Sequence, residues 1–218
     1  MFEAQAQCDL LHPKREDQTV LDELKFNIGS EAFEAQYQQQ PGPTDVKMVK
    51  RNWFAYYDRL PDITAEKYID QSWDTASKID PQNDWSVGTT WLLKDGFYDL
   101  LDICREKLTY TALRAKMTEK AIEYYPPVIL IKDAGVGTGL IDVLRHEGLN
   151  VVKIQPTQSK EIRAHIQTPV FQSSRVLFPR SAPWLSELKA EILTFPAGRN
   201  NDQVDSITQA LAYEYLTI

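Results

Sequence analysis

Apolar residues recur every three or four positions near the start of this chain, at Leu21, Leu24 and Ile28, which predicts a helix. A second helical segment is expected before the Pro-Gly-Pro sequence at 41–43 breaks the pattern. Residues 1–60 are therefore predicted to form a helical extension and linker.

The pattern changes over residues 61–218, which are predicted to form one α/β domain. Strands are expected over 68–74, 85–93, 97–107, 128–133 and 150–156. Helices are expected over 111–125, 139–148, 183–196 and 202–216. The turn Lys94-Asp95-Gly96 joins two strands as a hairpin, whereas a helix between the last two strands favours a parallel pair. Three antiparallel strands followed by parallel ones predict a mixed, five-stranded, ribonuclease-H-like sheet flanked by helices.

The composition is typical of a globular protein. Of the 218 residues, 43% are hydrophobic and 25% are charged, and no apolar run approaches the roughly 20 residues of a membrane span. Cys8 and Cys104 lack the spacing of a zinc site, and the first residues do not resemble a secretory signal. We therefore expect an intracellular protein that does not contact membranes.

The formal net charge is −7, which argues against nucleic acid as a ligand, because phosphate binding relies on Lys and Arg. The segment 151–190 nevertheless holds six basic residues and two acidic ones. The basic residues are Lys153, Lys160, Arg163, Arg175, Arg180 and Lys189. A phosphate-binding face and an ordinary solvated helix face both fit this segment.

Three acids stand where carboxylates could converge. Asp74 ends the first strand of the domain, Asp133 ends the 128–133 strand, and Asp202 begins the last helix. Divalent ions such as Mg²⁺ take oxygen ligands and can promote phosphodiester hydrolysis. Each acid also has a structural interpretation, because Asp202 suits a helix N-cap and the other two suit turns. Only their joint placement favours a metal site.

Several segments together resemble one known family. QSWDTASK, NDWSVGTTWL, VILIKDAGVGTGL, KEIRA, WLSELKAEILTFP and NDQVDSITQAL match, in this order, the carboxyl-terminal nuclease domain of phage and prophage large terminases. The resemblance covers roughly residues 10–218. It implies a metal-dependent endonuclease that cuts concatemeric double-stranded DNA during packaging. It also implies that Asp74 and Asp202 bind Mg²⁺ or Mn²⁺, as a two-ion site, with Asp205 as a supporting or alternative ligand.

The resemblance also implies partners and a location. The partners are double-stranded DNA, a terminase ATPase half or small subunit, and the portal protein. An ATPase domain is expected to precede Met1 in a full-length protein, and the site of action is expected to be the host-cell cytoplasm.

One position departs from the family pattern. When Gly137 is aligned with the matching glycine of the family, Lys132 occupies the position of the family's second acid. Strand alternation turns the next residue, Asp133, to the opposite face. Either Asp133 takes over the ligand role, or Lys132 has replaced a ligand and weakened metal binding. Lys160 and Arg163, spaced to share a helix face, are predicted to hold DNA phosphates.

Two other functions remain open. Lys132 favours a catalytically weakened DNA-binding remnant of a prophage. The sequence GVGTGL, with Gly135, Gly137 and Gly139 after a strand, favours a nucleotide-binding enzyme only weakly, because the dinucleotide fingerprint needs a different glycine spacing.

Overall fold

The computed structural model describes residues 18–28, 33, 48–59, 68–75 and 85–213. The chain divides into two compact units, 1–44 and 45–218. Helix α1 (Gln18–Ile28) belongs to the first unit and confirms the helix predicted around Leu21. Most of the second predicted helical segment lies outside the described residues. Among the described residues, every helix is too short or too polar to span a lipid bilayer.

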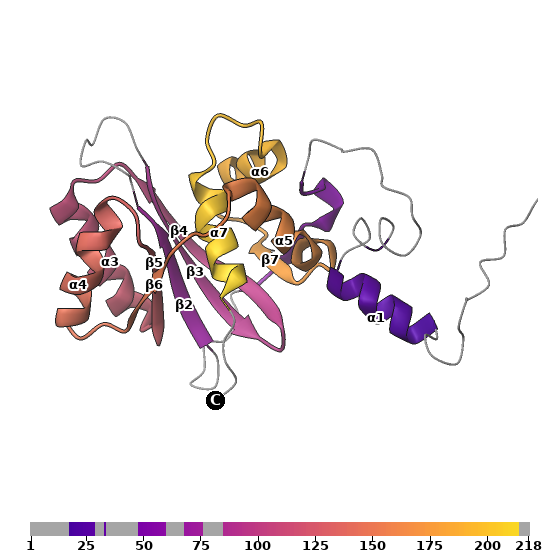
Figure 1. Ribbon diagram of the computed structural model, residues 1–218, viewed down its shortest axis with the longest axis horizontal. Coiled ribbons are helices and arrows are strands. Elements are labelled where there is room, and N and C mark those ends of the chain that lie inside the picture. The colour runs from indigo at the N-terminus through magenta and orange to yellow at the C-terminus, as the bar shows by residue number, and fades with distance from the viewer. Residues whose placement is uncertain (1–17, 29–32, 34–47, 60–67, 76–84, 214–218) are drawn as a thin grey trace, which may run out of the picture. The chain divides into compact units, whose positions relative to one another are not determined.

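A single mixed sheet is the framework of the second unit, with strand order β1-β7-β4-β3-β2-β5-β6 (Figure 1). The strands are β1 (Ala55–Tyr57), β2 (Tyr68–Asp74), β3 (Ser86–Lys94), β4 (Phe97–Glu106), β5 (Val128–Lys132), β6 (Val151–Ile154) and β7 (Val176–Pro179). Strands β2, β3 and β4 are antiparallel, and β5 and β6 run parallel to β2. The predicted ribonuclease-H-like fold class is confirmed, but the predicted count of five strands is wrong.

The sheet has seven strands because β1 and β7 extend one edge. β7 pairs in parallel with β4, and β1 pairs in parallel with β7. These strands have only three and four residues, and β1 finds its partner far along the chain, so neither shows a long alternating pattern. β1 lies within residues 1–60 and follows the short helix η1 (Arg51–Trp53). The domain boundary at residue 60 stays a prediction.

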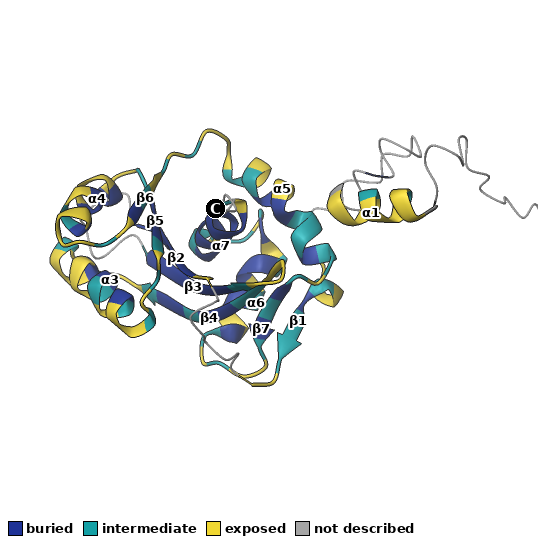
Figure 2. Ribbon diagram, turned by 90° about the horizontal axis from the view of Figure 1, so that it is seen from below, coloured by how far each residue is buried: buried dark blue, intermediate teal, exposed yellow. Residues whose placement is uncertain are grey.

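Helices cover both faces of the sheet (Figures 1 and 2). One face carries α3 (Tyr110–Tyr124) and α4 (Val136–His146); we call it the α4 face. The other carries α5 (Lys160–Gln172), α6 (Leu185–Thr194) and α7 (Asp202–Ala212); we call it the α7 face.

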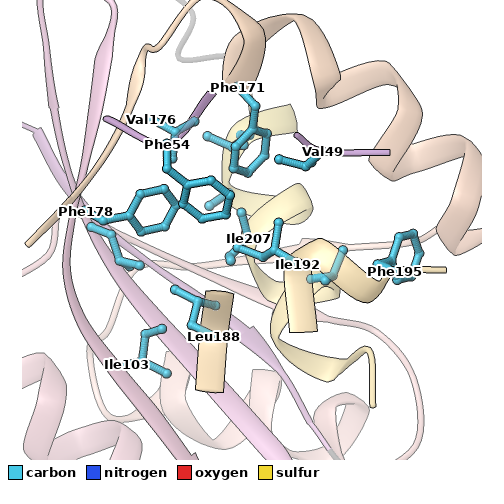
Figure 3. Close-up of a cluster of buried hydrophobic side chains, with 14 of the residues drawn as sticks. Val49, Phe54, Ile103, Phe171, Val176, Phe178, Leu188, Ile192, Phe195 and Ile207 are labelled. Atoms are coloured by element: carbon cyan, nitrogen blue, oxygen red, sulfur yellow. The ribbon is translucent and has the colours of Figure 1, made fainter. Parts of the chain in front are cut away.

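Each face has its own apolar core. On the α7 face, Phe54, Phe178, Leu188 and Ile207 belong to a buried cluster that joins the β1 edge to α6 and α7 (Figure 3). On the α4 face, Trp73 belongs to a second cluster with the apolar residues of α3 and α4. Burial of these side chains is the main force that holds the helices on the sheet.

Candidate active site at the carboxyl ends of β2 and β5

The register between two parallel strands brings Asp74 and Lys132 side by side. Trp73 of β2 pairs with Ile131 of β5, and both side chains pack into the core of the α4 face. Because strand side chains alternate, the next residue of each strand points to the α7 face. Asp74 and Lys132 therefore lie together beneath α7.

A buried polar seam fixes α7 on this face. The Ser72 hydroxyl donates to the Ser206 carbonyl, and the Ser206 hydroxyl donates to the Ser72 carbonyl, each at 2.7 Å. Gln209 Nε2 donates to Ser72 Oγ at 3.0 Å, and the Thr89 and Ser206 hydroxyls lie 2.9 Å apart. Buried hydrogen-bonded groups of this kind are costly to separate. The seam sets the position of Asp205, next to Ser206, over the end of β2.

Glu191 of α6 caps the start of α7. Its carboxylate accepts from the backbone N–H of Gln203 at 2.7 Å and of Val204 at 3.3 Å, and from Gln203 Nε2 at 2.7 Å. These are amides of the first helical turn, which lack partners within the helix. Asp202 is the first residue of α7, and Asn201 precedes the helix as its N-cap. The capping role considered for Asp202 is therefore largely filled by Glu191.

Three cations meet two buried carboxylates at this point; we call these five residues the charge cluster. Lys132 Nζ lies 2.9 Å from Asp74 Oδ1 and 3.3 Å from Asp205 Oδ2. Lys160 Nζ lies 2.6 Å from Asp205 Oδ2, and Arg163 Nη2 lies 2.7 Å from Asp205 Oδ1. The Asp205 side chain is only 2% exposed. Its carboxylate is thus shared by β5 and α5, and Lys132 links it to Asp74.

Burial and charge act differently on the two acids. Burial raises the pKa of Asp74 to about 6, although the Lys132 ammonium opposes that rise. Burial would also raise the pKa of Asp205, but the hydrogen bond from Lys160 and the charges of Lys132 and Arg163 outweigh it and lower the pKa. Burial works against the Lys132 charge, yet Asp74 and Asp205 keep its pKa raised. Lys132 is therefore an ammonium ion at neutral pH.

Asp133 lies in different surroundings. Its Oδ2 is 2.6 Å from Lys153 Nζ on β6, and hydrogen bonds from Lys153 and Thr138 lower its pKa. Its backbone N–H donates to the Ile154 carbonyl and so continues the pairing of β5 with β6. The structure brings Asp74 together with Asp205, through Lys132, and pairs Asp133 with Lys153 instead.

The residues present do not fit a two-ion metal centre. Within the described parts of the chain, no three His, Cys, Asp or Glu side chains are grouped so that they could hold a metal ion. Mg²⁺ and Mn²⁺ take oxygen ligands, whereas an ammonium group offers only donors. In the charge cluster an ammonium stands between the two acids. The metal roles predicted for Asp74, Asp133, Asp202 and Asp205 stay predictions.

The two basic residues of α5 point into the charge cluster. Lys160 and Arg163 both bind Asp205, and Lys160 Nζ also donates to Asn201 Oδ1 at 2.8 Å. Their spacing predicted a shared helix face, and in the structure this face meets Asp205. The Lys160 side chain is 33% exposed, so it also reaches the surface beside the cluster. Its predicted contact with DNA phosphates stays a prediction.

The glycine-rich sequence after β5 has a packing explanation. Gly135 precedes α4 with a positive φ of 56°, and Gly137 lies in the first turn of the helix. A Cβ atom at Gly137 would collide with the Lys132 carbonyl oxygen. Only glycine allows α4 to begin so close to the end of β5. This accounts for Gly137 without a bound nucleotide.

Comparison with solved structures finds the same fold in large terminases. The large terminase nuclease of thermophilic phage G20c with bound cobalt has a TM-score of 0.60 and 16% identity, over 79% of this chain and all of that one. The magnesium-bound form has a TM-score of 0.58 and 17% identity over the same shares. The large terminase of another thermophilic bacteriophage, in complex with ADP, has a TM-score of 0.66 and 10% identity, over 89% of this chain and 51% of that one.

At these identities the likeness establishes the fold. A search of curated protein sequences gives no match. A family model described as the terminase RNase H-like domain matches residues 71–214, which is more than half of the chain and includes β5 and α7. The chain therefore belongs to the family of terminase RNase H-like domains.

Proposed function

We propose that this chain is the nuclease-type domain of a phage or prophage large terminase and that its substrate is double-stranded DNA. The observation that carries the proposal is the placement of Asp74 and Asp205, from β2 and α7, in one buried cluster inside the segment that the family model matches. The reaction class is hydrolysis of the phosphodiester backbone. In its fully active form a domain of this kind would cut concatemeric DNA during packaging in the host-cell cytoplasm, with an ATPase half or small subunit and the portal as partners.

Basic residues beside the cluster support DNA as the ligand. Lys160 and Arg163 carry positive charge to the rim of the site, on the segment that has six basic and two acidic residues. Their charge exceeds what Asp205 alone neutralises. Phosphate groups bind such positions, and the binding weakens as salt rises.

Lys132 favours a DNA-binding domain whose nuclease activity is weakened. Its ammonium lies between the two acids, where a metal-dependent nuclease needs carboxylate oxygen atoms and open ligand positions. We therefore propose that the wild-type domain binds double-stranded DNA and cleaves it slowly or not at all. Structures of the G20c nuclease hold bound cobalt or magnesium, whereas we propose that this chain binds such ions only weakly.

Fluorescence anisotropy with a labelled DNA duplex tests the binding. We expect binding at low salt that falls steeply as salt rises, and weaker binding by Lys160→Gln. Lys116→Gln, which removes the same charge from α3 on the opposite face, is the matched control and should bind as wild type does. No binding of duplex DNA at low salt, or binding of nucleotides alone, would overturn the proposal.

Plasmid nicking in Mn²⁺ tests the cleavage. Wild type should leave most of the plasmid supercoiled, whereas Lys132→Glu should nick it, and adding Asp74→Asn to Lys132→Glu should abolish the nicking. A wild-type protein that nicks as fast as Lys132→Glu, and loses this activity in Asp74→Asn, would show a fully active nuclease and refute the weakened form.

A further inference from the structure

We propose that Lys132 is the resident cation of the site and that its ammonium group excludes divalent metal ions from the space between Asp74 and Asp205. This inference deepens the proposed function and rests on it for its biological meaning. The geometric evidence is the pair of contacts from one nitrogen atom, 2.9 Å to Asp74 Oδ1 and 3.3 Å to Asp205 Oδ2. One ammonium group thus links the two acids.

The charge balance of the cluster opposes a metal ion. Three cations, Lys132, Lys160 and Arg163, surround two carboxylates, so the cluster is already positive when both acids are ionised. A divalent ion would meet the Lys132 ammonium at short range, and like charges repel strongly in a poorly solvated site. The acids themselves are 8% and 2% exposed, so solvent screens this repulsion little.

The position of Lys132 in the fold keeps it there. It is the last residue of β5, its backbone is paired with Ile154 of β6, and its carbonyl oxygen packs against Gly137. Its side chain is 17% exposed and has its two acids as partners. Because β2 and β5 pair in register, the side chain of residue 132 points to the same face of the sheet as Asp74. The type of residue at position 132 therefore decides which chemical group lies beside that acid.

The same geometry predicts the effect of exchanging the residue. Lys132→Glu removes a positive charge and places a third carboxylate beside Asp74 and Asp205. Lys132→Gln removes only the charge. Lys94→Glu makes the same charge change at the exposed last residue of β3 and is the matched control.

Mn²⁺ titration by calorimetry, with thermal unfolding of the same proteins, tests the proposal on the whole chain. We expect Lys132→Glu to bind Mn²⁺ about tenfold more tightly than wild type or more, the range seen when groups around a metal are altered. Adding Asp74→Asn should remove the gain, and Lys94→Glu should behave as wild type. Lys132→Gln should unfold at a lower temperature than wild type, and Mn²⁺ should raise its melting temperature more than it raises that of wild type.

Two results would overturn the proposal. One is wild type binding Mn²⁺ as tightly as Lys132→Glu, with the binding lost in Asp74→Asn. The other is a Lys132→Glu protein that keeps the circular dichroism of wild type yet binds Mn²⁺ no better than Lys94→Glu. If Lys132→Glu does not fold, Lys132→Gln decides, because an unchanged response to Mn²⁺ would then contradict the proposal.

Duplex binding in EDTA separates this inference from the proposed function. If the metal results are as expected but wild type does not bind DNA, the proposed function is refuted and the proposal that Lys132 excludes metal ions is supported. If wild type binds DNA and also binds Mn²⁺ at Asp74, the proposed function is supported and the proposal about Lys132 is refuted.

Discussion

The last residue of β5 and the residue after it lie in contrasting surroundings. Lys132 points to the α7 face and joins two buried acids, whereas Asp133 makes one ion pair with Lys153, whose side chain is 47% exposed. The two positions are adjacent in sequence. Their difference shows that strand alternation and the helix packed above decide which of two adjacent charged residues becomes part of the charge cluster.

The largest effect is expected when the charge cluster loses its shared acid. Asp205→Asn leaves Lys132, Lys160 and Arg163 without their common carboxylate in a buried position. Breaking a buried ion pair from one side costs about 3–5 kcal/mol of unfolding free energy. Urea unfolding measures the loss, and a change below about 1 kcal/mol, typical of exposed pairs, would show that the cluster behaves as a surface feature.

A side chain added where α4 approaches the end of β5 should have the next largest effect on stability. Gly137→Ala places a methyl group against the Lys132 carbonyl oxygen, so α4 or the end of β5 must move, at a cost of about 1–3 kcal/mol. Gly139→Ala in the same helix is the control, because its Cβ would be 3.7 Å from Tyr110 in ordinary contact. Thermal unfolding should show a lower melting temperature for the first variant alone. Equal melting temperatures of Gly137→Ala and wild type would contradict the close approach of α4 to β5.

Loss of the α7 cap is expected to be milder and to depend on pH. Glu191→Gln weakens a cap of the kind worth about 1 kcal/mol. Burial raises the pKa of Glu191, although the donors of Gln203 and Val204 oppose the rise. The folded state then takes up a proton at a higher pH than the unfolded chain does, so protonation stabilises the fold.

Relative to Glu191→Gln, wild type should therefore gain stability as pH falls from neutral toward the ordinary pKa of a glutamate. Urea unfolding of both proteins over this pH range provides the measurement. A wild type that loses stability relative to the variant on acidification would show that the pKa is lowered instead.

The smallest effect is expected on the opposite side of the strand. Asp133→Asn removes one charge of a pair in which the lysine side chain is 47% exposed and the acid 10% exposed, so the loss should lie near the upper end of the about 0–1 kcal/mol that exposed pairs contribute. Chemical denaturation should show a loss well below that of Asp205→Asn. If Asp133→Asn were as damaging as Asp205→Asn, the contrast between the two sides of β5 would be refuted.

The sequence predicts the central strands and the hairpin of this fold better than the edge strands of the sheet. The strands that end at Asp74 and Lys132 follow from strand-like runs bounded by turn residues, and Asp95-Gly96 marks the hairpin with φ values of 53° and 78°. β1 and β7 were not predicted, because each is short and gains its pairing only from a distant strand. Tertiary pairing decides such segments.

The site was predictable in part. Alternation indicates that residues 132 and 133 face opposite sides of the sheet, and the register of β5 with β2 makes residue 132 the one beside Asp74. That Lys132 reaches Asp205, and that Glu191 caps α7, depends on how α6 and α7 pack on the sheet. These contacts join residues that no local pattern relates, so the sequence pointed to Lys132, Lys160 and Arg163 without showing that all three bind Asp205.

The central claim is that the Lys132 ammonium takes the place of a metal ion. The most direct test is a crystal of the wild-type protein soaked in Mn²⁺, with anomalous scattering used to locate the metal. We expect no anomalous peak within bonding distance of Asp74, and continuous density for Lys132 between Asp74 and Asp205. A strong peak bound to Asp74, with the Lys132 side chain turned away, would contradict the account.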